Sequence, residues 1–113
     1  MPFKLAISNT ILTKVKGTYI DENGALKTFD FQLEQTRIDQ AELQRVVTDK
    51  GENASEFVKR ITTGWRGQKL VLNDDNSAAV FSQDALDCLL GISGMGGHCY
   101  QAYIDQMLVK QKN

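Results

Sequence analysis

The chain has 113 residues, of which 42% are hydrophobic and 24% charged, with nine glycines and one proline. This length and composition are typical of one folded domain and exclude a disordered linker or a collagen-like repeat. Thirteen basic residues nearly balance fourteen acidic residues, so the charge does not indicate the basic face expected of a protein that binds nucleic acid.

The sequence predicts a protein without a membrane segment. No run approaches 18 consecutive apolar residues, and residues 1–20 lack the unbroken apolar stretch of a secretory signal. We therefore expect the chain to stay in the cytoplasm where it is made. Its two cysteines, Cys88 and Cys99, are expected to be reduced and partly buried there.

Residues 3–35 predict an antiparallel β-hairpin. Residues 3–20 and 28–34 alternate between apolar and polar side chains, which is typical of half-buried strands, and residues 21–24 supply turn chemistry. The apolar positions of both runs are odd-numbered: Phe3, Leu5, Ile7, Ile11, Val15, Tyr19, Phe29, Phe31 and Leu33. They share a face if a bulge at Gly24 pairs Asp21 with Ala25, which sets Val15 opposite Phe31 and Gly17 opposite Phe29.

Two helices are expected next. Residues 38–48 begin with a capping box of Asp39 and Glu42 and a hydrophobic staple of Ile38 and Leu43. A second helix is expected to begin at Asn53 or Ser55 and to bury Phe57, Val58 and Ile61. We expect Gly64 to end this helix as a C-cap, and the run 70–72 to form a short apolar segment before a polar turn at 73–77.

Two further helices complete the prediction. Ser82 is expected to cap a third helix that buries Leu86, Leu89 and Leu90 and ends at Gly91. Residues 93–97 predict a flexible joint, followed by a last helix over about 98–110, with Lys110 and Lys112 near its C-terminal end. The expectation is one α+β domain over 1–113, with a hairpin or small sheet in 1–35 packed against about four helices in 37–111.

No set of residues predicts catalysis, a cofactor or a metal. His98 is the only histidine, and it cannot pair with Cys99 because adjacent helical side chains diverge; Cys88 could approach it only through folding. Two cysteines and one histidine are too few for a structural zinc site. The acidic turn 73–76 lacks the glycine of a calcium loop, and the glycines of 91–97 match no phosphate-binding motif. We expect a protein that is not an enzyme.

Residues 55–108 resemble the tail assembly chaperones of long-tailed bacteriophages. The resemblance rests on a helix followed by Gly64 and Trp65, an acidic turn at 73–76, Phe81 and Ser82 before a leucine-rich helix, and a last helix with Tyr103 near its middle. It implies that the protein binds the tape measure protein, a long helical chain that sets tail length, and keeps it soluble in the host cytoplasm until the tail assembles. Such a chaperone is absent from the mature particle, and a longer form made by ribosomal slippage is common in the family.

The hypothesis names a partner-binding surface on the helical part. Its expected residues are Trp65, Phe81, Leu86, Leu90, Tyr100, Tyr103 and Met107. Trp65 is open to two interpretations, an anchor of the core or a contact for a partner, and a homo-oligomer is also open. The main alternative function is a structural minor tail or head–tail connector protein that stays in the particle.

Overall fold

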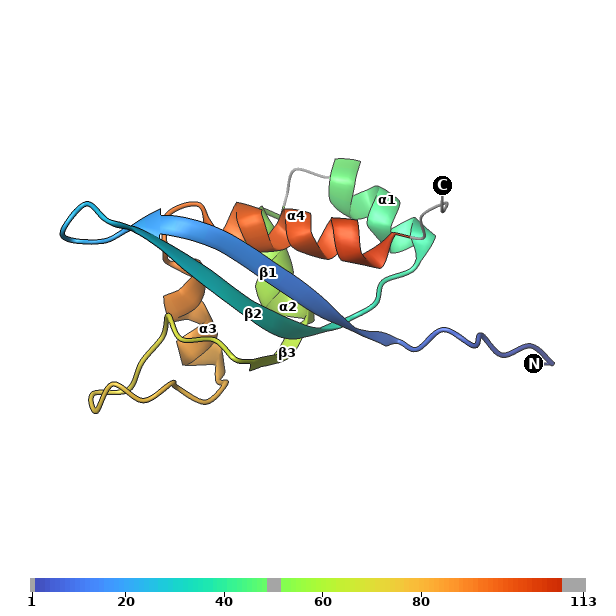
Figure 1. The fold of residues 1–113 in the computed structure, drawn as a ribbon. Helices are drawn as coiled ribbons and strands as arrows, with labels where there is room; N and C mark the ends of the chain where they lie inside the picture. The colour runs from blue at the N-terminus through green and yellow to red at the C-terminus, as the bar shows by residue number, and fades with distance from the viewer. Residues whose placement is uncertain (1, 49–51, 109–113) are drawn as a thin grey trace, which may run out of the picture.

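The computed structural model describes residues 2–48 and 52–108, and this part of the chain forms an α+β fold with three strands and four helices. The strands form one antiparallel sheet in the order β1-β2-β3. The elements are β1 (Thr10–Ile20), β2 (Leu26–Thr36), α1 (Gln40–Thr48), α2 (Ala54–Ile61), β3 (Thr62–Arg66), α3 (Gln83–Leu90) and α4 (Met95–Met107) (Figure 1). The predicted fold class is confirmed.

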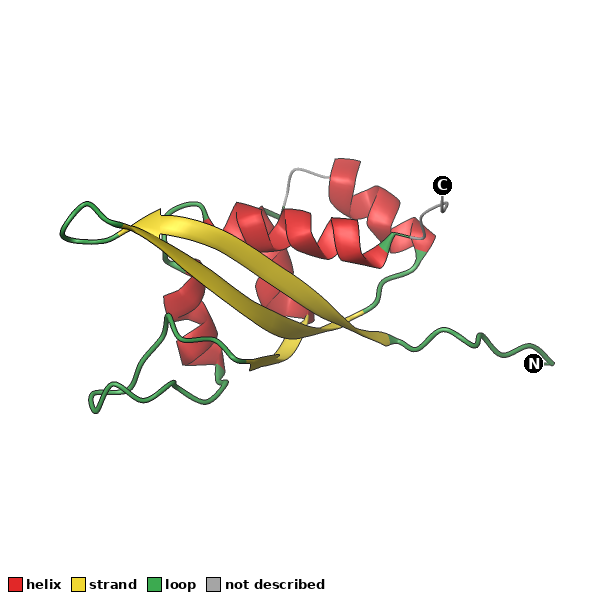
Figure 2. Cartoon of the chain, in the orientation of Figure 1, coloured by secondary structure: helices red, strands yellow, loops and turns green. Residues whose placement is uncertain are grey.

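The hairpin of β1 and β2 has the predicted register. Val15 lies opposite Phe31 and Gly17 opposite Phe29. At the turn, Asp21 N donates to Ala25 O at 3.0 Å, and Gly24 adopts a φ of 81°, which a residue with a Cβ rarely takes. Figure 2 shows the two long strands side by side, with the turn at one end and the N-terminal segment leaving the other end.

The N-terminal segment differs from the prediction. Alternation starts at Phe3 in the sequence, but β1 begins only at Thr10. The ladder between the two strands ends where Arg37 N donates to Asn9 O at 2.6 Å, because the chain beyond Arg37 turns away into α1 and offers no further strand. Phe3 and Leu5 are consequently 82% and 80% exposed, and Ile7 is also exposed.

The helices cover one face of the sheet. Odd-numbered residues of the hairpin face them, so Val15, Phe31 and Leu33 are buried, whereas the even-numbered Lys14 and Lys16 are exposed. Helix α4 lies against β1, and α2 packs against α4 and α3. Burial of these apolar side chains, together with those of α2, α3 and α4, makes the main core and supplies most of the driving force for folding.

The predicted helix starts are confirmed in their caps. Asn53 accepts a hydrogen bond from Glu56 N at 2.8 Å and forms a complete capping box before α2. Ser82 Oγ accepts from Ala85 N at 3.0 Å before α3. Asp39 Oδ1 accepts from Glu42 N at 2.9 Å, but the Glu42 carboxylate pairs with Arg45 and Arg60 rather than returning to the Asp39 backbone.

These caps give a first prediction. We expect Ser82→Ala and Asp39→Ala each to lower the free energy of unfolding by about 1 kcal/mol, because each leaves a first-turn N–H without its side-chain acceptor. Chemical denaturation of the purified variants measures the change. Ser93→Ala is the matched control, since no cap rests on that exposed serine, and a loss at Ser93 equal to that at Ser82 would contradict the assignment.

Gly64 does not end a helix, so that expectation is wrong. Helix α2 stops at Ile61 because Thr62 is already extended and begins β3. Gly64 lies opposite Glu34 in the sheet, where a Cβ would stand 2.7 Å from Glu34 Oε1. The glycine therefore makes room for the Glu34 side chain, whose carboxylate pairs with Arg66 at 2.8 Å. This third strand falls within the part of the chain expected to be helical.

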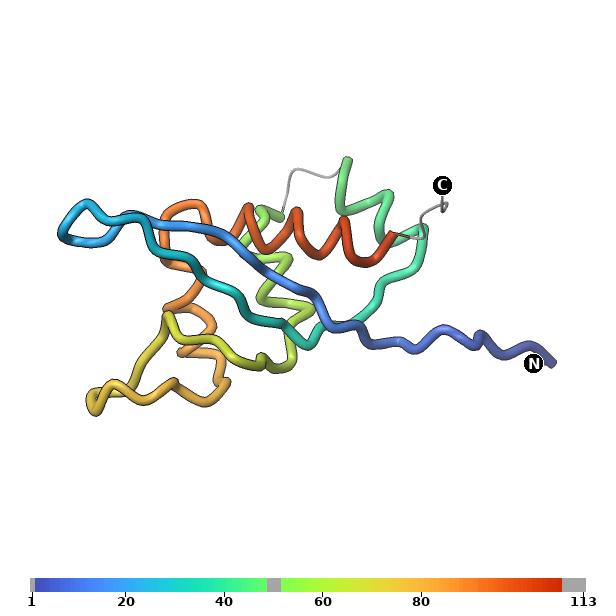
Figure 3. Tube along the Cα trace, in the orientation of Figure 1, coloured from blue at the N-terminus to red at the C-terminus, as the bar shows by residue number. Residues whose placement is uncertain are grey.

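Residues 67–82 connect β3 to α3 as a long loop that extends away from the sheet and helices (Figure 3). The apolar run 70–72 forms no strand, only a single bridge between Leu72 and Ala78. Between them lies the predicted polar turn, in which Asn73 N donates to Ser77 O at 2.8 Å. Asn76 takes the left-handed conformation with a φ of 68°.

The last helix begins earlier than predicted. Helix α4 starts at Met95, directly after Gly94, whose φ is 81°. Gly96 and Gly97 are therefore part of the helix and not of a flexible joint. Gly96 is buried where α4 crosses α2: a Cβ there would stand 1.9 Å from Ser55 Oγ. The helix ends at Met107, and the expected Lys110 and Lys112 contribution lies outside the described residues.

Candidate partner-binding site

Four of the seven predicted contact residues belong to the core. Tyr103 and Leu86 are fully buried, and Leu90 and Met107 are at most 9% exposed. Helical spacing places Leu86 and Leu90 on one face of α3, and Tyr103 and Met107 on one face of α4. Both faces are turned toward the core. The expectation that Tyr103 is exposed is therefore wrong, and a charge placed there would test folding instead of binding.

The other three residues are half-buried and packed. Trp65 Nε1 donates to Ala79 O at 3.2 Å, and the Trp65 ring meets Phe81 edge to face with centroids 5.4 Å apart. The pair holds the end of the 67–82 segment onto β3. Tyr100 packs edge to face on Phe57 in α2. Trp65 is thus an anchor within the fold, with part of its surface left open.

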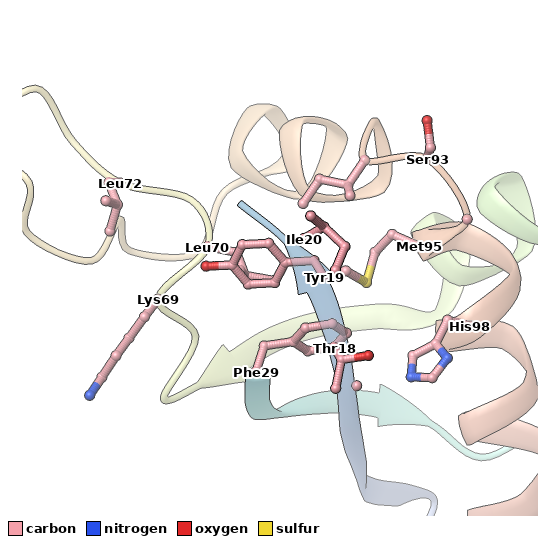
Figure 4. Close-up of a pocket in the computed structure, with 13 residues that line it drawn as sticks. Thr18, Tyr19, Ile20, Phe29, Lys69, Leu70, Leu72, Ser93, Met95 and His98 are labelled. Atoms are coloured by element: carbon pink, nitrogen blue, oxygen red, sulfur yellow. The ribbon is translucent and has the colours of Figure 1, made fainter. Parts of the chain in front are cut away.

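A different place offers an open apolar surface. A cavity of about 830 Å³ lies between the turn end of the hairpin, residues 69–72 and the α3–α4 connection. Figure 4 shows Tyr19, Phe29 and Met95 converging there, while Lys69 points away from them. Its lining residues are Gly17, Thr18, Tyr19, Ile20, Phe29, Lys69, Leu70, Leu72, Ile92, Ser93, Gly94, Met95 and His98. We call this the hairpin cavity.

The floor of the hairpin cavity is made by the hairpin itself. Gly17 is on the side of β1 that carries the apolar residues and lies opposite Phe29. A Cβ at Gly17 would lie 2.5 Å from Phe29 Cζ. The missing side chain lets the Phe29 ring lie across β1. On the other side, the left-handed turn at Gly94 starts α4 so that Met95 is buried beneath the cavity.

The wall formed by residues 69–72 is held in place by a buried glutamine that was not among the predicted site residues. Gln68 is 2% exposed, and its amide oxygen accepts from Val71 N at 2.8 Å. Its amide nitrogen donates to Val71 O at 2.9 Å and to Ala79 O at 3.1 Å. These bonds fold the chain so that Val71 enters the core and Leu72 is left exposed at the cavity.

The hairpin cavity carries little charge. Among the described residues that line it, Lys69 and His98 are the basic ones and none has a carboxylate. His98 is exposed; its Nε2 lies 2.5 Å from Lys16 O, and its ring meets Phe29 edge to face. An apolar lining with few polar groups suits an apolar ligand surface better than a charged one.

Within residues 2–48 and 52–108, no group of three His, Cys, Asp or Glu side chains is placed to hold a metal ion. In that part of the chain no helix combines the length and the apolar character needed to cross a membrane.

The two cysteines are in opposite environments, which gives a second prediction. Cys88 is exposed, whereas Cys99 is buried and its burial raises the pKa of the thiol to about 12. Since the thiolate is the reactive form, we expect one thiol per folded chain to react with a maleimide or Ellman's reagent near neutral pH, and two after unfolding. Cys88→Ser should abolish the reaction of the folded protein. Rapid labelling of Cys99 in that variant would contradict the packing of α4.

Comparison of the chain with family models, curated proteins and solved structures gave no match.

Sequence reasoning missed the hairpin cavity because its lining comes from four separate segments. Two signals pointed toward it. Gly17 is a glycine at a position of β1 where the alternation predicts an apolar side chain. Ile92 is an apolar residue that follows α3 and does not belong to the buried face of that helix. Neither signal identifies a cavity without the fold that brings the segments together.

Proposed function

We propose that this protein is a tail assembly chaperone that binds a long helical chain, the tape measure protein of a long-tailed bacteriophage, and keeps it soluble before assembly. The hairpin cavity carries the proposal, together with the resemblance of residues 55–108. In this view the protein acts in the host cytoplasm and leaves before the particle is complete. It needs no catalytic group for this task.

The surface around the cavity suits part of an amphipathic helix. Tyr19, Ile20, Leu72 and Ile92 are exposed at it, so apolar area stands ready for a partner. An α-helix with its side chains is about 10–12 Å wide. The cavity therefore takes the side chains of one or two turns while the helix body lies across the opening. Covering apolar stripes in this way prevents their aggregation.

The test is co-expression with the candidate tape measure protein, scoring the soluble fraction of the partner. We expect Leu72→Asp and Ile92→Asp to reduce it strongly, because each places a charge on apolar surface that must be desolvated on binding. Val47→Asp is the matched control: Val47 is also an exposed apolar residue but does not line the cavity. Circular dichroism establishes that each variant is folded.

Two outcomes count against the proposal. One is equal solubility of the partner with and without this chain. The other is a fixed number of copies of this chain in purified mature particles, which would favour the alternative of a structural minor tail or head–tail connector protein.

A further inference from the structure

We propose that two copies of this chain associate by exchanging their N-terminal segments, each inserting Leu5 and Ile7 into the hairpin cavity of the other. Residues 2–8 are named the arm here. Self-association goes beyond the proposed function, and because the arm occupies the same hairpin cavity, a partner helix must displace it in order to bind.

Within residues 2–48 and 52–108, the arm is an apolar surface without a partner in its own copy. Phe3, Leu5 and Ile7 alternate with less apolar residues, and all three are exposed. None of them belongs to the core or packs against it, and the partly buried residues around the core begin at Ile11. Three large apolar side chains in one exposed stretch are the kind of contiguous patch that marks an interaction site.

The arm cannot reach the hairpin cavity of its own copy. Asn9 is fixed by its hydrogen bond from Arg37 N, so the arm pivots there. Leu5 is four residues from Asn9 and extends at most about 14 Å from it. Gly17 is eight residues along the hairpin from Asn9, a distance of about 26 Å. An arm that enters this cavity must therefore come from another molecule.

A second copy can receive the arm of the first copy and insert its own arm into the first copy at the same time. The arm leaves the start of β1 (Figure 1), whereas the cavity is lined by residues 17–20 at the far end of this strand. If two β1 strands run antiparallel beside each other, each arm lies along the far end of the other hairpin. One register of this pairing brings Leu5 of one copy beside Tyr19 of the other and Ile7 beside Gly17. Their side chains then lie on the face that carries Phe29. Such a pairing is two-fold and closes on itself.

The charges agree with this arrangement. Lys4 is the only charged residue of the arm, and the turn at the far end of the hairpin carries Asp21 and Glu22. Exchange places the lysine near this acidic turn, while the cavity itself remains free of carboxylates among its described lining residues. Opposite charges at the margin of an apolar contact favour the correct orientation over the reverse one.

The first experiment is sedimentation velocity on the full chain over a range of concentrations. We expect a reversible monomer–dimer equilibrium for the parent protein and at least about a tenfold weaker association for Leu5→Asp, the effect of removing an apolar anchor. Ala6→Asp is the matched control, because in an extended arm Ala6 points to the opposite side. Leu5 is highly exposed, so the variant keeps the fold.

The second experiment locates the contact. In a Cys88→Ser background, one preparation carries Leu5→Cys and another Tyr19→Cys, and mild oxidation of the mixture should yield a disulfide-linked heterodimer. Ala6→Cys should cross-link less. A parent protein that is monomeric at every concentration, a Leu5→Asp variant that associates like the parent, or equal cross-linking from Ala6 would overturn the proposal.

These results are separable from the proposed function. Leu5→Asp should lose self-association while keeping the partner soluble, because the cavity itself is intact. Leu72→Asp should lose both activities. If Leu5→Asp leaves the dimer intact, arm exchange fails although the chaperone proposal stands.

Discussion

Gly96→Val should lower the free energy of unfolding by about 3 kcal/mol, the largest loss we expect from a single substitution described for this protein. The cause is the close crossing of α4 over α2. A Cβ at position 96 would stand 1.9 Å from Ser55 Oγ, which can rotate away, but also 3.1 Å from Ser55 Cβ and 3.3 Å from Ser55 Cα, which cannot. A branched side chain forces the two helices apart and opens the core between them.

Gly97→Val is the matched control for this effect. Position 97 lies in the same helix, but a Cβ there has nothing within 4 Å. Because valine forms helix better than glycine, the control should be neutral or stabilising by a few tenths of a kcal/mol. Urea denaturation of both variants gives the difference. Similar losses at the two positions would contradict the close crossing.

Tyr103→Phe should cost about 2 kcal/mol, since it removes one oxygen atom that joins two parts of the chain. The Tyr103 hydroxyl donates to Thr36 O at 2.7 Å and accepts from Ile38 N at 3.2 Å. Thr36 is the last residue of β2, and Ile38 lies in the connection from β2 to α1. Phenylalanine fills the same space but leaves the carbonyl and the amide without this partner.

Tyr100→Phe controls for the loss of a hydroxyl as such. Tyr100 is half-buried in the same helix, and its ring packs on Phe57 through its edge. We expect a change within about 0.5 kcal/mol. If thermal and urea denaturation show equal losses for the two variants, the hydroxyl of Tyr103 does not stabilise the connection as described.

The elements that the sequence predicted best are those specified by local chemistry. The register of the hairpin follows from the alternation of apolar residues and the bulge at Gly24, and both act within a few residues. The caps at Asn53 and Ser82 are equally local, because a side chain one turn away satisfies the backbone. The buried positions of α2 and α3 follow from helical periodicity in the same way.

The failures arise where a distant segment decides the outcome. A glycine at position 64 is typical of a helix end, but its pairing with Glu34 places it in a strand. Gly96 lies in a glycine-rich stretch that is typical of a flexible joint, yet it packs closely against Ser55. Among the predicted partner-binding residues, Tyr100, Tyr103 and Met107 form an apolar stripe, and periodicity cannot tell whether such a stripe faces the core or a partner. Tyr103 and Met107 face the core.

The hydroxyl of Tyr103 also has a consequence during synthesis. It binds the backbone of Thr36, from which it is separated by 67 positions in the chain. At the usual speed of translation, roughly 3 to 13 s pass between the synthesis of these two residues. During that interval both strands of the hairpin have been synthesised, but the helix that covers their apolar face is not yet complete. The newly made chain is thus itself briefly prone to aggregation, and its last helix is the element that ends this state.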